Sequence, residues 1–260
     1  YEYCDLLITG SGPSGLASAY AAAKNGARVI LAEDKPRFGG SLLTSDVNIG
    51  NQTGVEWTEK IIAELKSMPN VTVKNRSQVF GYYDHNMLVM SERISDHLPK
   101  TQKYLPKQRL WYIRANEVLI SSGSIERPLV FGNNDTPGVM LSSAAKEYMK
   151  VYGVLVGKKP LIFTNNDSGY ETAIEFKKNG VNPIILDTRS NPSSDIITEA
   201  KNLNIEIRFS YVVVAAKGYK KVKSADIAKI SDDKKELFNI ENIEWDSISV
   251  SGFWTTSIHL

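Results

Sequence analysis

The feature that most constrains the fold is a glycine-rich segment close to the start of the sequence, in which Gly10, Gly12 and Gly15 follow a short apolar run. That run, residues 5–9, has β character, and the alanine-rich residues 16–24 behind the glycines predict a helix. In such a unit the first glycine permits a tight turn, the second lets the backbone approach a pyrophosphate, and the third lets the helix pack close to the strand. The segment therefore predicts the start of a dinucleotide-binding βαβ unit.

The residues that follow complete this unit. Asn25-Gly26 predicts the end of the helix, because glycine adopts the left-handed cap conformation without a steric cost. A second strand over residues 28–32 leads to Glu33, whose carboxylate can accept hydrogen bonds from a ribose diol and repels a 2′-phosphate. The unpaired N–H groups at the start of the helix favour the phosphates. The sequence therefore predicts an NAD or FAD site rather than an NADP site, and a glycine-rich turn without a ligand is the weaker interpretation.

Two further segments predict close backbone approaches to the cofactor. Gly39-Gly40 follows the acid after a short loop, and residues 117–124 predict a buried strand that ends in small residues. The three histidines have neither metal-ligand spacing nor a paired carboxylate, so no catalytic residue and no metal ligand is predicted. The predicted cofactor-binding residues are Gly10, Gly12, Pro13, Ser14, Gly15, Glu33, Asp34, Arg37, Gly40, Ser41, Ser122 and Gly123.

Between the glycine-rich unit and the second half of the chain, the sequence predicts a helix and a small antiparallel layer. Thr58 is the predicted N-cap of a helix that runs through Met68. Residues 88–90 and 110–114 have the pattern of strands in an antiparallel layer, on either side of a charged, exposed loop over residues 91–108.

The second half of the chain repeats the architecture of the first. Residues 160–163 predict a short apolar strand, residues 170–179 a helix, and residues 181–186 a second strand that leads to Asp187. This order is again strand, helix, strand and acid. The sequence therefore predicts a second Rossmann-like unit.

The turn of this second unit lacks the glycine pattern. Residues 164–169 read Thr-Asn-Asn-Asp-Ser-Gly, and Ser168 with Glu171 predicts a capping box that satisfies the helix N–H groups internally. Asp167 and Glu171 also place negative charge where a pyrophosphate would lie. We therefore expect this unit to keep its fold and to have lost its dinucleotide site.

Composition restricts the remaining possibilities. The chain of 260 residues is 42% hydrophobic and 23% charged, as in ordinary globular proteins of one or two domains. Its net charge is +2 without a basic stripe, and it lacks an apolar run of about 20 residues, so neither nucleic acid nor a membrane is an expected partner. Cys4 is the only cysteine, which excludes a C-x-x-C redox pair within the chain. With the absence of a signal-peptide pattern, this favours a cytoplasmic location.

The predicted fold class is α/β, with two Rossmann-like dinucleotide-binding domains of the FAD/NAD(P)-binding, thioredoxin-reductase-like type, the second inserted into the first. The turn signals in residues 133–138 mark the boundary between them. The first residue is not Met, and predicted strands lie near both ends, so we expect a fragment of a longer polypeptide. The first domain is predicted to comprise residues 1–135 and 243–260, with its C-terminal part truncated, and the second residues 136–242.

The order of these motifs resembles that of flavoprotein reductases with two dinucleotide domains, in which the first holds FAD and the second NAD(P)H. Disulfide reduction is excluded because the chain has no thiol pair. A more specific resemblance is to the alpha subunit of heterotetrameric sarcosine oxidase, although that family usually has two glycines where Gly252-Phe253 stands. The runs that carry it are residues 80–86, 126–131, 163–168 and 250–254, the last with the leading pair Trp245-Asp246.

This resemblance implies that the chain is the NAD-binding portion of a longer alpha subunit, with beta, gamma and delta subunits as partners and with FAD and FMN on the beta subunit. It implies oxidative demethylation of sarcosine to glycine with O₂ and tetrahydrofolate, which gives H₂O₂ and methylenetetrahydrofolate. The isolated chain would then lack a complete active site. The alternatives are a self-standing FAD-dependent NADH oxidoreductase and a protein that keeps a dinucleotide for stability alone. Glu33 suits the ribose of either NAD or FAD, so the residues leave both open.

Overall fold

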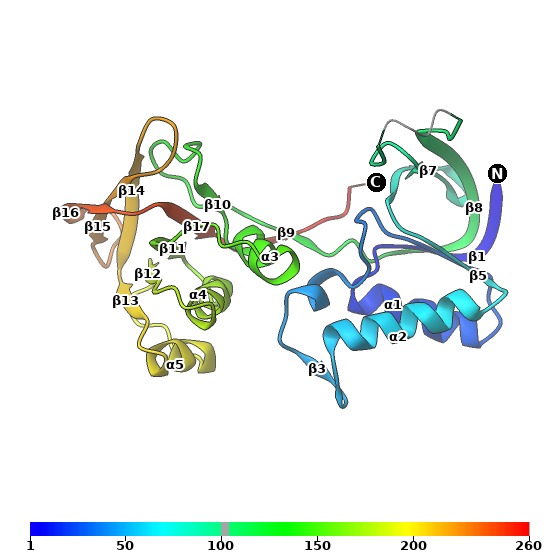
Figure 1. Cartoon of the computed structure of the whole chain (residues 1–260), viewed down its shortest axis with the longest axis horizontal. Helices are drawn as coiled ribbons and strands as arrows, with labels where there is room; N and C mark the ends of the chain where they lie inside the picture. Colours follow the sequence, from blue (N-terminus) through cyan, green and yellow to red (C-terminus); the bar gives the residue numbers. More distant parts are fainter. Residues whose placement is uncertain (100–103, 260) are drawn as a thin grey trace. The chain divides into compact units, whose positions relative to one another are not determined.

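The computed structural model describes residues 1–99 and 104–259, which form two compact units (Figure 1). Unit 1 comprises Tyr1–Ser124 with Thr256–Leu260, and unit 2 comprises Ile125–Thr255. Each contains a parallel sheet with helices, so the predicted α/β class with two Rossmann-like units is confirmed. Because unit 1 is made of two segments, unit 2 is inserted into it.

Unit 1 contains a six-stranded sheet in the order β5-β2-β1-β8-β7-β6. β5, β2, β1 and β8 run parallel, and β7 and β6 continue the same sheet in the antiparallel direction. The predicted antiparallel arrangement of residues 88–90 and 110–114 is confirmed. Residues 100–103 of the predicted exposed loop lie outside the described residues. The strands are β1 (Glu2–Thr9), β2 (Val29–Ala32), β5 (Val71–Lys74), β6 (Ser77–Tyr83), β7 (Met87–Arg93) and β8 (Gln108–Ile120).

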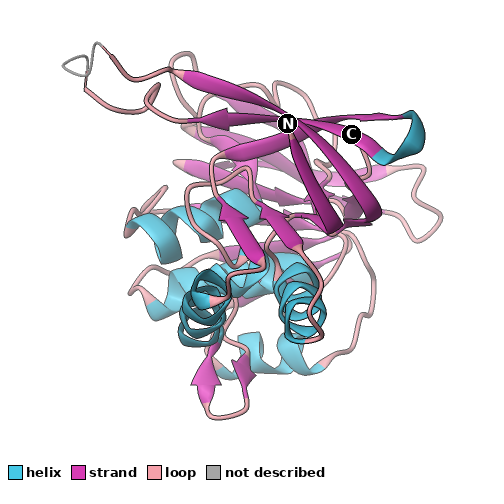
Figure 2. Ribbon diagram, turned by 90° about the vertical axis from the view of Figure 1, so that its right-hand side faces the viewer, coloured by secondary structure: helices cyan, strands magenta, loops and turns pink. Residues whose placement is uncertain are grey.

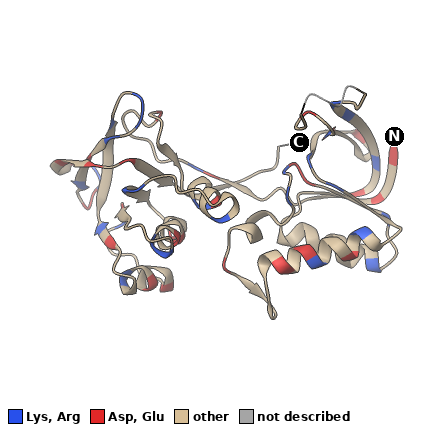
Figure 3. Cartoon of the chain, in the orientation of Figure 1, with Lys and Arg blue, Asp and Glu red and all other residues tan. Residues whose placement is uncertain are grey.

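Two helices, α1 (Pro13–Lys24) and α2 (Gly54–Ser67), cover one face of this sheet (Figure 1 and Figure 2). Strand side chains alternate between faces, so Ile8 and Leu31 pack under the helices, whereas Leu7 packs on the opposite face. The solvent side of α2 carries residues of both charges (Figure 3). The short elements of the unit are η1 (Gly40–Leu43), η2 (Asp84–Asn86) and the hairpin of β3 (Asn48–Ile49) with β4 (Gln52–Thr53).

The predicted start of α2 at Thr58 is wrong. The N-cap is Thr53, whose hydroxyl accepts a hydrogen bond from the Glu56 N–H at 3.3 Å, while the Glu56 carboxylate accepts one from the Thr53 N–H at 2.8 Å. This reciprocal capping box begins the helix five residues earlier than predicted. Thr58 is instead buried within the helix, and its hydroxyl donates to the Gly54 carbonyl at 2.8 Å.

Unit 2 contains a five-stranded parallel sheet in the order β10-β17-β11-β12-β13. Three helices pack on one face of this sheet, and a three-stranded antiparallel sheet, β14-β15-β16, packs on the other. Its helices are α3 (Ser142–Tyr152), α4 (Ser168–Lys178) and α5 (Asp195–Asn202), and its strands are β10 (Val139–Leu141), β11 (Pro160–Thr164), β12 (Ile184–Asp187), β13 (Glu206–Phe209), β14 (Tyr211–Lys217), β15 (Ser224–Ile230), β16 (Leu237–Glu244) and β17 (Ser247–Ser251). Within residues 1–99 and 104–259, no helix has the length and apolar character that a membrane span requires.

The final strand of the parallel sheet, β17, lies in unit 2 and not in the first domain, where the sequence predicted it. Residues 243–260 were predicted to belong to the first domain, but β17 pairs with β10 and β11 inside the sheet of unit 2. All five of its residues are buried there, because a central parallel strand has both faces covered. The predicted domain boundaries at 135 and 243 stay predictions. The chain passes between the units through β9 (Ser124–Glu126) and β18 (Trp254–Thr256), which pair as a two-stranded ribbon.

Candidate dinucleotide site

Three loops converge at one edge of the unit 1 sheet. They follow β1, β2 and β8, which are adjacent parallel strands, so their carboxyl ends lie together. The Gly39 N–H donates to the Ser11 carbonyl at 3.0 Å, which joins the loop after β2 to the glycine-rich turn. The Ser121 N–H donates to the Thr9 carbonyl at 2.8 Å, which joins the end of β8 to the same turn.

The three glycines of this turn meet different surroundings. Gly10 has φ +95°, and a Cβ there would collide with the Ser121 carbonyl. A Cβ at Gly15 would collide with the Gly10 carbonyl, so both glycines are required by the close packing of turn, helix and strand. Gly12 has an ordinary φ of −67°, and apart from its chain neighbours no described residue has an atom within 4 Å of a Cβ placed on it. Glycine at this position is therefore not required by the protein's own packing, and the open space suits a ligand.

Helix α1 starts at this open space. Pro13 occupies its first turn, and within the described residues no side chain hydrogen-bonds to its N-terminal N–H groups. Ser14 is exposed beside them. Free backbone donors at a helix N-terminus favour a phosphate group, so the residues present fit the pyrophosphate of a dinucleotide.

Glu33 follows β2 and is only 6% exposed. One of its carboxylate oxygens accepts hydrogen bonds from the Ser11 N–H at 2.8 Å and the Ser11 hydroxyl at 2.5 Å, and the other accepts one from the Lys35 N–H at 3.0 Å. Burial, and next the neighbouring carboxyl of Asp34, raise the pKa of Glu33 above its ordinary value, against the opposing effect of these hydrogen bonds. The predicted ribose-binding carboxylate therefore also fastens the glycine-rich turn to the sheet.

The remaining predicted residues lie around this turn. Gly40 has φ +54°, and a Cβ on it would lie 2.9 Å from the Cα of Gly12. The loop that carries Gly40 therefore packs directly against the glycine-rich turn. Ser41 is exposed in η1. Ser122 donates through its hydroxyl to the Ser257 carbonyl, and the Ser257 N–H donates to the Gly123 carbonyl at 2.9 Å. Ser257, in the C-terminal segment of unit 1, thus forms hydrogen bonds with Ser122 and Gly123, which were predicted to contact the cofactor.

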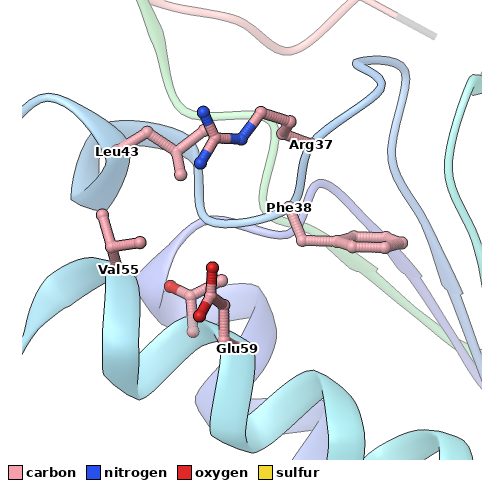
Figure 4. Close-up of a pocket in the computed structure, with 6 residues that line it drawn as sticks. Arg37, Phe38, Leu43, Val55 and Glu59 are labelled. Carbon is pink, nitrogen blue, oxygen red and sulfur yellow. The ribbon is translucent and has the colours of Figure 1, made fainter. Parts of the chain in front are cut away.

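Arg37 borders a cavity of about 190 Å³ between the loop after β2 and the start of α2 (Figure 4). Its guanidinium extends across the cavity toward Leu43, and the Glu59 carboxylate points into it from α2. The lining residues are Arg37, Phe38, Leu43, Val55, Thr58 and Glu59. The assignment of Arg37 to the cofactor stays a prediction.

Ser11 is a site residue that the sequence reasoning missed. It is fully buried, and it joins Glu33 and Gly39 to the turn through its backbone and its hydroxyl. The signal was a hydroxyl residue between the first two glycines, where a side chain can reach the acid at the end of the next strand.

The corresponding edge of unit 2 is filled by its own side chains. Asp187, at the position equivalent to Glu33, is fully buried and accepts hydrogen bonds from the Tyr170 hydroxyl at 2.7 Å and from Arg189 at 2.8 Å. Arg189 also forms an ion pair with Asp167 at 2.8 Å. Burial lowers the pKa of Arg189, but the bonds to the two carboxylates outweigh it and raise the pKa overall. Arg189 thereby connects the acid to the turn before α4.

The capping box predicted for α4 does not form. The Ser168 N–H donates to the Asn166 side chain at 2.9 Å, and the Ser168 hydroxyl accepts a hydrogen bond from the Trp254 indole at 2.9 Å. Glu171 pairs with Lys146 at 2.5 Å instead of turning back to the cap. At the start of α4 the Asn166 side chain therefore satisfies the Ser168 N–H, and the N-cap residue Asp167 makes no side-chain cap bond.

Fold and site together define a nucleotide-cofactor-binding protein of the FAD/NAD(P)-binding class. Residues 5–94 match the family model described as FAD dependent oxidoreductase. Thioredoxin reductase from T. acidophilum is similar in structure, with a TM-score of 0.72 and 16% identity, over 97% of this chain and 77% of that one. At this identity the likeness concerns the fold alone.

Comparison with curated sequences gives a more specific relationship. The chain is 38% identical to the sarcosine oxidase subunit alpha of Rhizobium meliloti (strain 1021), over 100% of this chain and 25% of that subunit. It is 33% identical to the subunit of the same name from Corynebacterium sp. (strain P-1), over 100% of this chain and 27% of that subunit. The chain is thus a homologue of sarcosine oxidase alpha subunits, as the motifs predicted. It spans about a quarter of their length.

Proposed function

We propose that this chain is the dinucleotide-binding portion of the alpha subunit of a multi-subunit sarcosine oxidase, and that unit 1 holds one NAD. The proposal rests on the identity to alpha subunits along the whole chain. Within the molecule, the carrying observation is Gly12, where open space meets the uncapped start of α1. At the equivalent edge of unit 2, Asp167 forms an ion pair with Arg189 at 2.8 Å, and its negative charge opposes a pyrophosphate there.

The residues of unit 1 have separate tasks in this proposal. The backbone at Gly12 and the first turn of α1 bind the pyrophosphate, and the carboxylates after β2 bind the adenosine ribose. Ser11 and Gly40 hold the loops against each other so that this arrangement is formed before the cofactor arrives. A bound nicotinamide dinucleotide supplies a hydride-accepting ring.

The reaction and the partners belong to the proposed complex. Beta, gamma and delta subunits would complete it, with FAD and FMN on the beta subunit. Sarcosine would be demethylated to glycine with O₂ and tetrahydrofolate, giving H₂O₂ and methylenetetrahydrofolate. The chain described here then contributes cofactor binding and lacks a complete active site. A cytoplasmic location remains part of the proposal.

The second candidate is a self-standing FAD-dependent NADH oxidoreductase. The observation that favours it is the match of residues 5–94 to the FAD dependent oxidoreductase model. Such an enzyme needs a hydride donor site in unit 2, and the ion pair of Asp167 with Arg189 lies where the donor's phosphates would enter.

An absorbance spectrum of the purified chain, followed by denaturation and mass analysis of the released molecule, separates the two candidates. A colourless protein that releases NAD supports the sarcosine-oxidase-type module. Flavin bands and released FAD would overturn the NAD assignment and support the second candidate.

A second experiment tests the role of Gly12. Gly12→Ala should fold normally and lose more than about tenfold in dinucleotide affinity, or about 1.4 kcal/mol. Ala17→Ser, a matched addition of one atom at an exposed position of α1, should lose nothing.

A further inference from the structure

The cavity beside α2 is lined by a cation, an acid and apolar side chains. The Arg37 guanidinium extends across it, and the Glu59 carboxylate points into it from α2 (Figure 4). Phe38, Leu43 and Val55 supply the apolar part of its wall. A charge of each sign beside an apolar wall matches a small zwitterion that carries an apolar side chain.

The two charges of this cavity are available to a ligand. Within residues 1–99 and 104–259, Arg37 and Glu59 form no hydrogen bond and no ion pair. The nearby Glu56 carboxylate, in contrast, is occupied by Thr53 in the capping box. A guanidinium binds a carboxylate through two parallel N–H donors, and a carboxylate accepts hydrogen bonds from an ammonium group. The cavity can therefore hold both ends of one zwitterion.

The loop after β2 separates this cavity from the glycine-rich turn. Gly40 faces the turn, because a Cβ on it would lie 2.9 Å from the Gly12 Cα. Gly39 faces α2 instead, because a Cβ on it would lie 3.1 Å from both the Thr58 hydroxyl and the Leu43 side chain. Thr58 and Leu43 line the cavity, so the cavity and the open space at Gly12 lie on different sides of this loop.

The volume of the cavity limits the size of its ligand. About 190 Å³ equals the space of roughly six water molecules in the liquid. Bonded atoms lie closer together than neighbouring waters, so an amino acid of about eight non-hydrogen atoms fills this space. A peptide or a nucleotide is too large for it.

We propose that this cavity binds a small α-amino acid with a short apolar side chain, whose carboxylate pairs with Arg37 and whose ammonium group pairs with Glu59. The side chain of the amino acid packs against Leu43 and Val55. This inference goes beyond the proposed function, because it does not require a dinucleotide. It assigns Arg37 to the amino acid, whereas the sequence predicted Arg37 as a cofactor residue.

The first test uses L-valine as the probe, with two matched probes that each lack one charge. Isobutylamine lacks the carboxylate, and isovalerate lacks the ammonium group. In the full chain with labelled Leu and Val methyl groups, the NMR signals of Leu43 and Val55 report binding. L-valine should shift both signals with a Kd of about 1 mM or lower. Each matched probe should bind about tenfold or more weakly, the loss expected for one hydrogen bond between charged groups. Unshifted signals at about ten times this L-valine concentration would overturn the inference.

Variants test the two charges separately. Arg37→Met should bind L-valine about tenfold more weakly and isobutylamine as before, and Glu59→Gln should do the same with isovalerate as the unaffected probe. Lys60→Met removes an exposed charge next to Glu59 that does not line the cavity, so it should bind L-valine normally. Thermal unfolding confirms that each variant is folded. Equal L-valine affinities in the two cavity variants and Lys60→Met would overturn the inference.

An excess of NAD separates this inference from the proposed dinucleotide site. L-valine should bind equally well with and without NAD, because the loop after β2 lies between the two sites. Displacement of L-valine by NAD would overturn the inference and return Arg37 to the cofactor. A chain that binds L-valine but no NAD would support the inference and contradict the proposed function.

Discussion

At the residue scale, Gly10 and Gly12 are two glycines of one motif with different physical requirements. Gly10→Ala forces an L side chain into φ +95° and against the Ser121 carbonyl. Left-handed strain and a backbone collision each cost about 1–3 kcal/mol, so we expect a loss of about 3 kcal/mol or more in the free energy of unfolding. Chemical denaturation of Gly10→Ala beside Gly12→Ala checks this, and equal stability of the two variants would contradict the assigned roles.

The buried Glu33 predicts a dependence of stability on pH. Its pKa in the folded chain is raised above the ordinary 4.5, mainly by burial. A group with a raised pKa contributes its full stability below its unfolded pKa and loses that contribution as the pH rises through the folded value. The stability of the cofactor-free chain relative to Glu33→Gln should therefore fall as the pH rises from below 4.5. Denaturation of both proteins over this range checks the sign, and a relative gain with pH would refute it.

At the element scale, the start of α2 depends on the capping box of Thr53 with Glu56. Thr53→Ala removes the side-chain acceptor for the Glu56 N–H and should lower the free energy of unfolding by about 1 kcal/mol. Lys60→Ala, at an exposed position inside the same helix, should change it by less than about 0.5 kcal/mol. Denaturant titration of the three proteins measures both effects, and similar losses in the two variants would argue against a specific cap.

The elements also indicate what the sequence could predict. The glycine turn, its helix and Glu33 were predictable because each is specified by residues within one βαβ unit. The cap of α4 was not, because Trp254 and Lys146 are distant in sequence and take the groups that Ser168 and Glu171 would have shared. A local sequence pattern indicates which capping hydrogen bonds are possible, but contacts with residues distant in sequence determine which of these bonds form.

The two errors in placing elements have a similar origin. The start of α2 was placed at its apolar run, although the Thr53-x-x-Glu56 pattern lies upstream and is interrupted by Gly54, a weak helix former. The final strand, β17, was assigned to the first domain, because an apolar run does not specify the sheet in which it pairs. Ser11 was not predicted as a site residue, because its hydrogen-bond partner, Glu33, lies at the end of another strand.

At the scale of the whole molecule, the two units predict one dinucleotide per chain. Arg189→Met leaves Asp187 buried without its counter-charge and should destabilise unit 2 by about 3 kcal/mol. It should leave the affinity and the stoichiometry of dinucleotide binding unchanged, because the site lies in unit 1. Thermal unfolding and titration calorimetry report these two properties separately. Loss of the bound dinucleotide in a folded Arg189→Met chain would contradict the assignment to unit 1.

The insertion of unit 2 also orders events during synthesis. All six strands of the main unit 1 sheet are translated by residue 120, before any part of unit 2 emerges from the ribosome. Domains generally fold as units in the order in which they are made, so the glycine-rich turn can form early. The partners of Ser122 and Gly123, however, are both supplied by Ser257. The edge of the cofactor site is therefore completed only after unit 2 has been translated, so a complete site depends on the synthesis of the inserted unit.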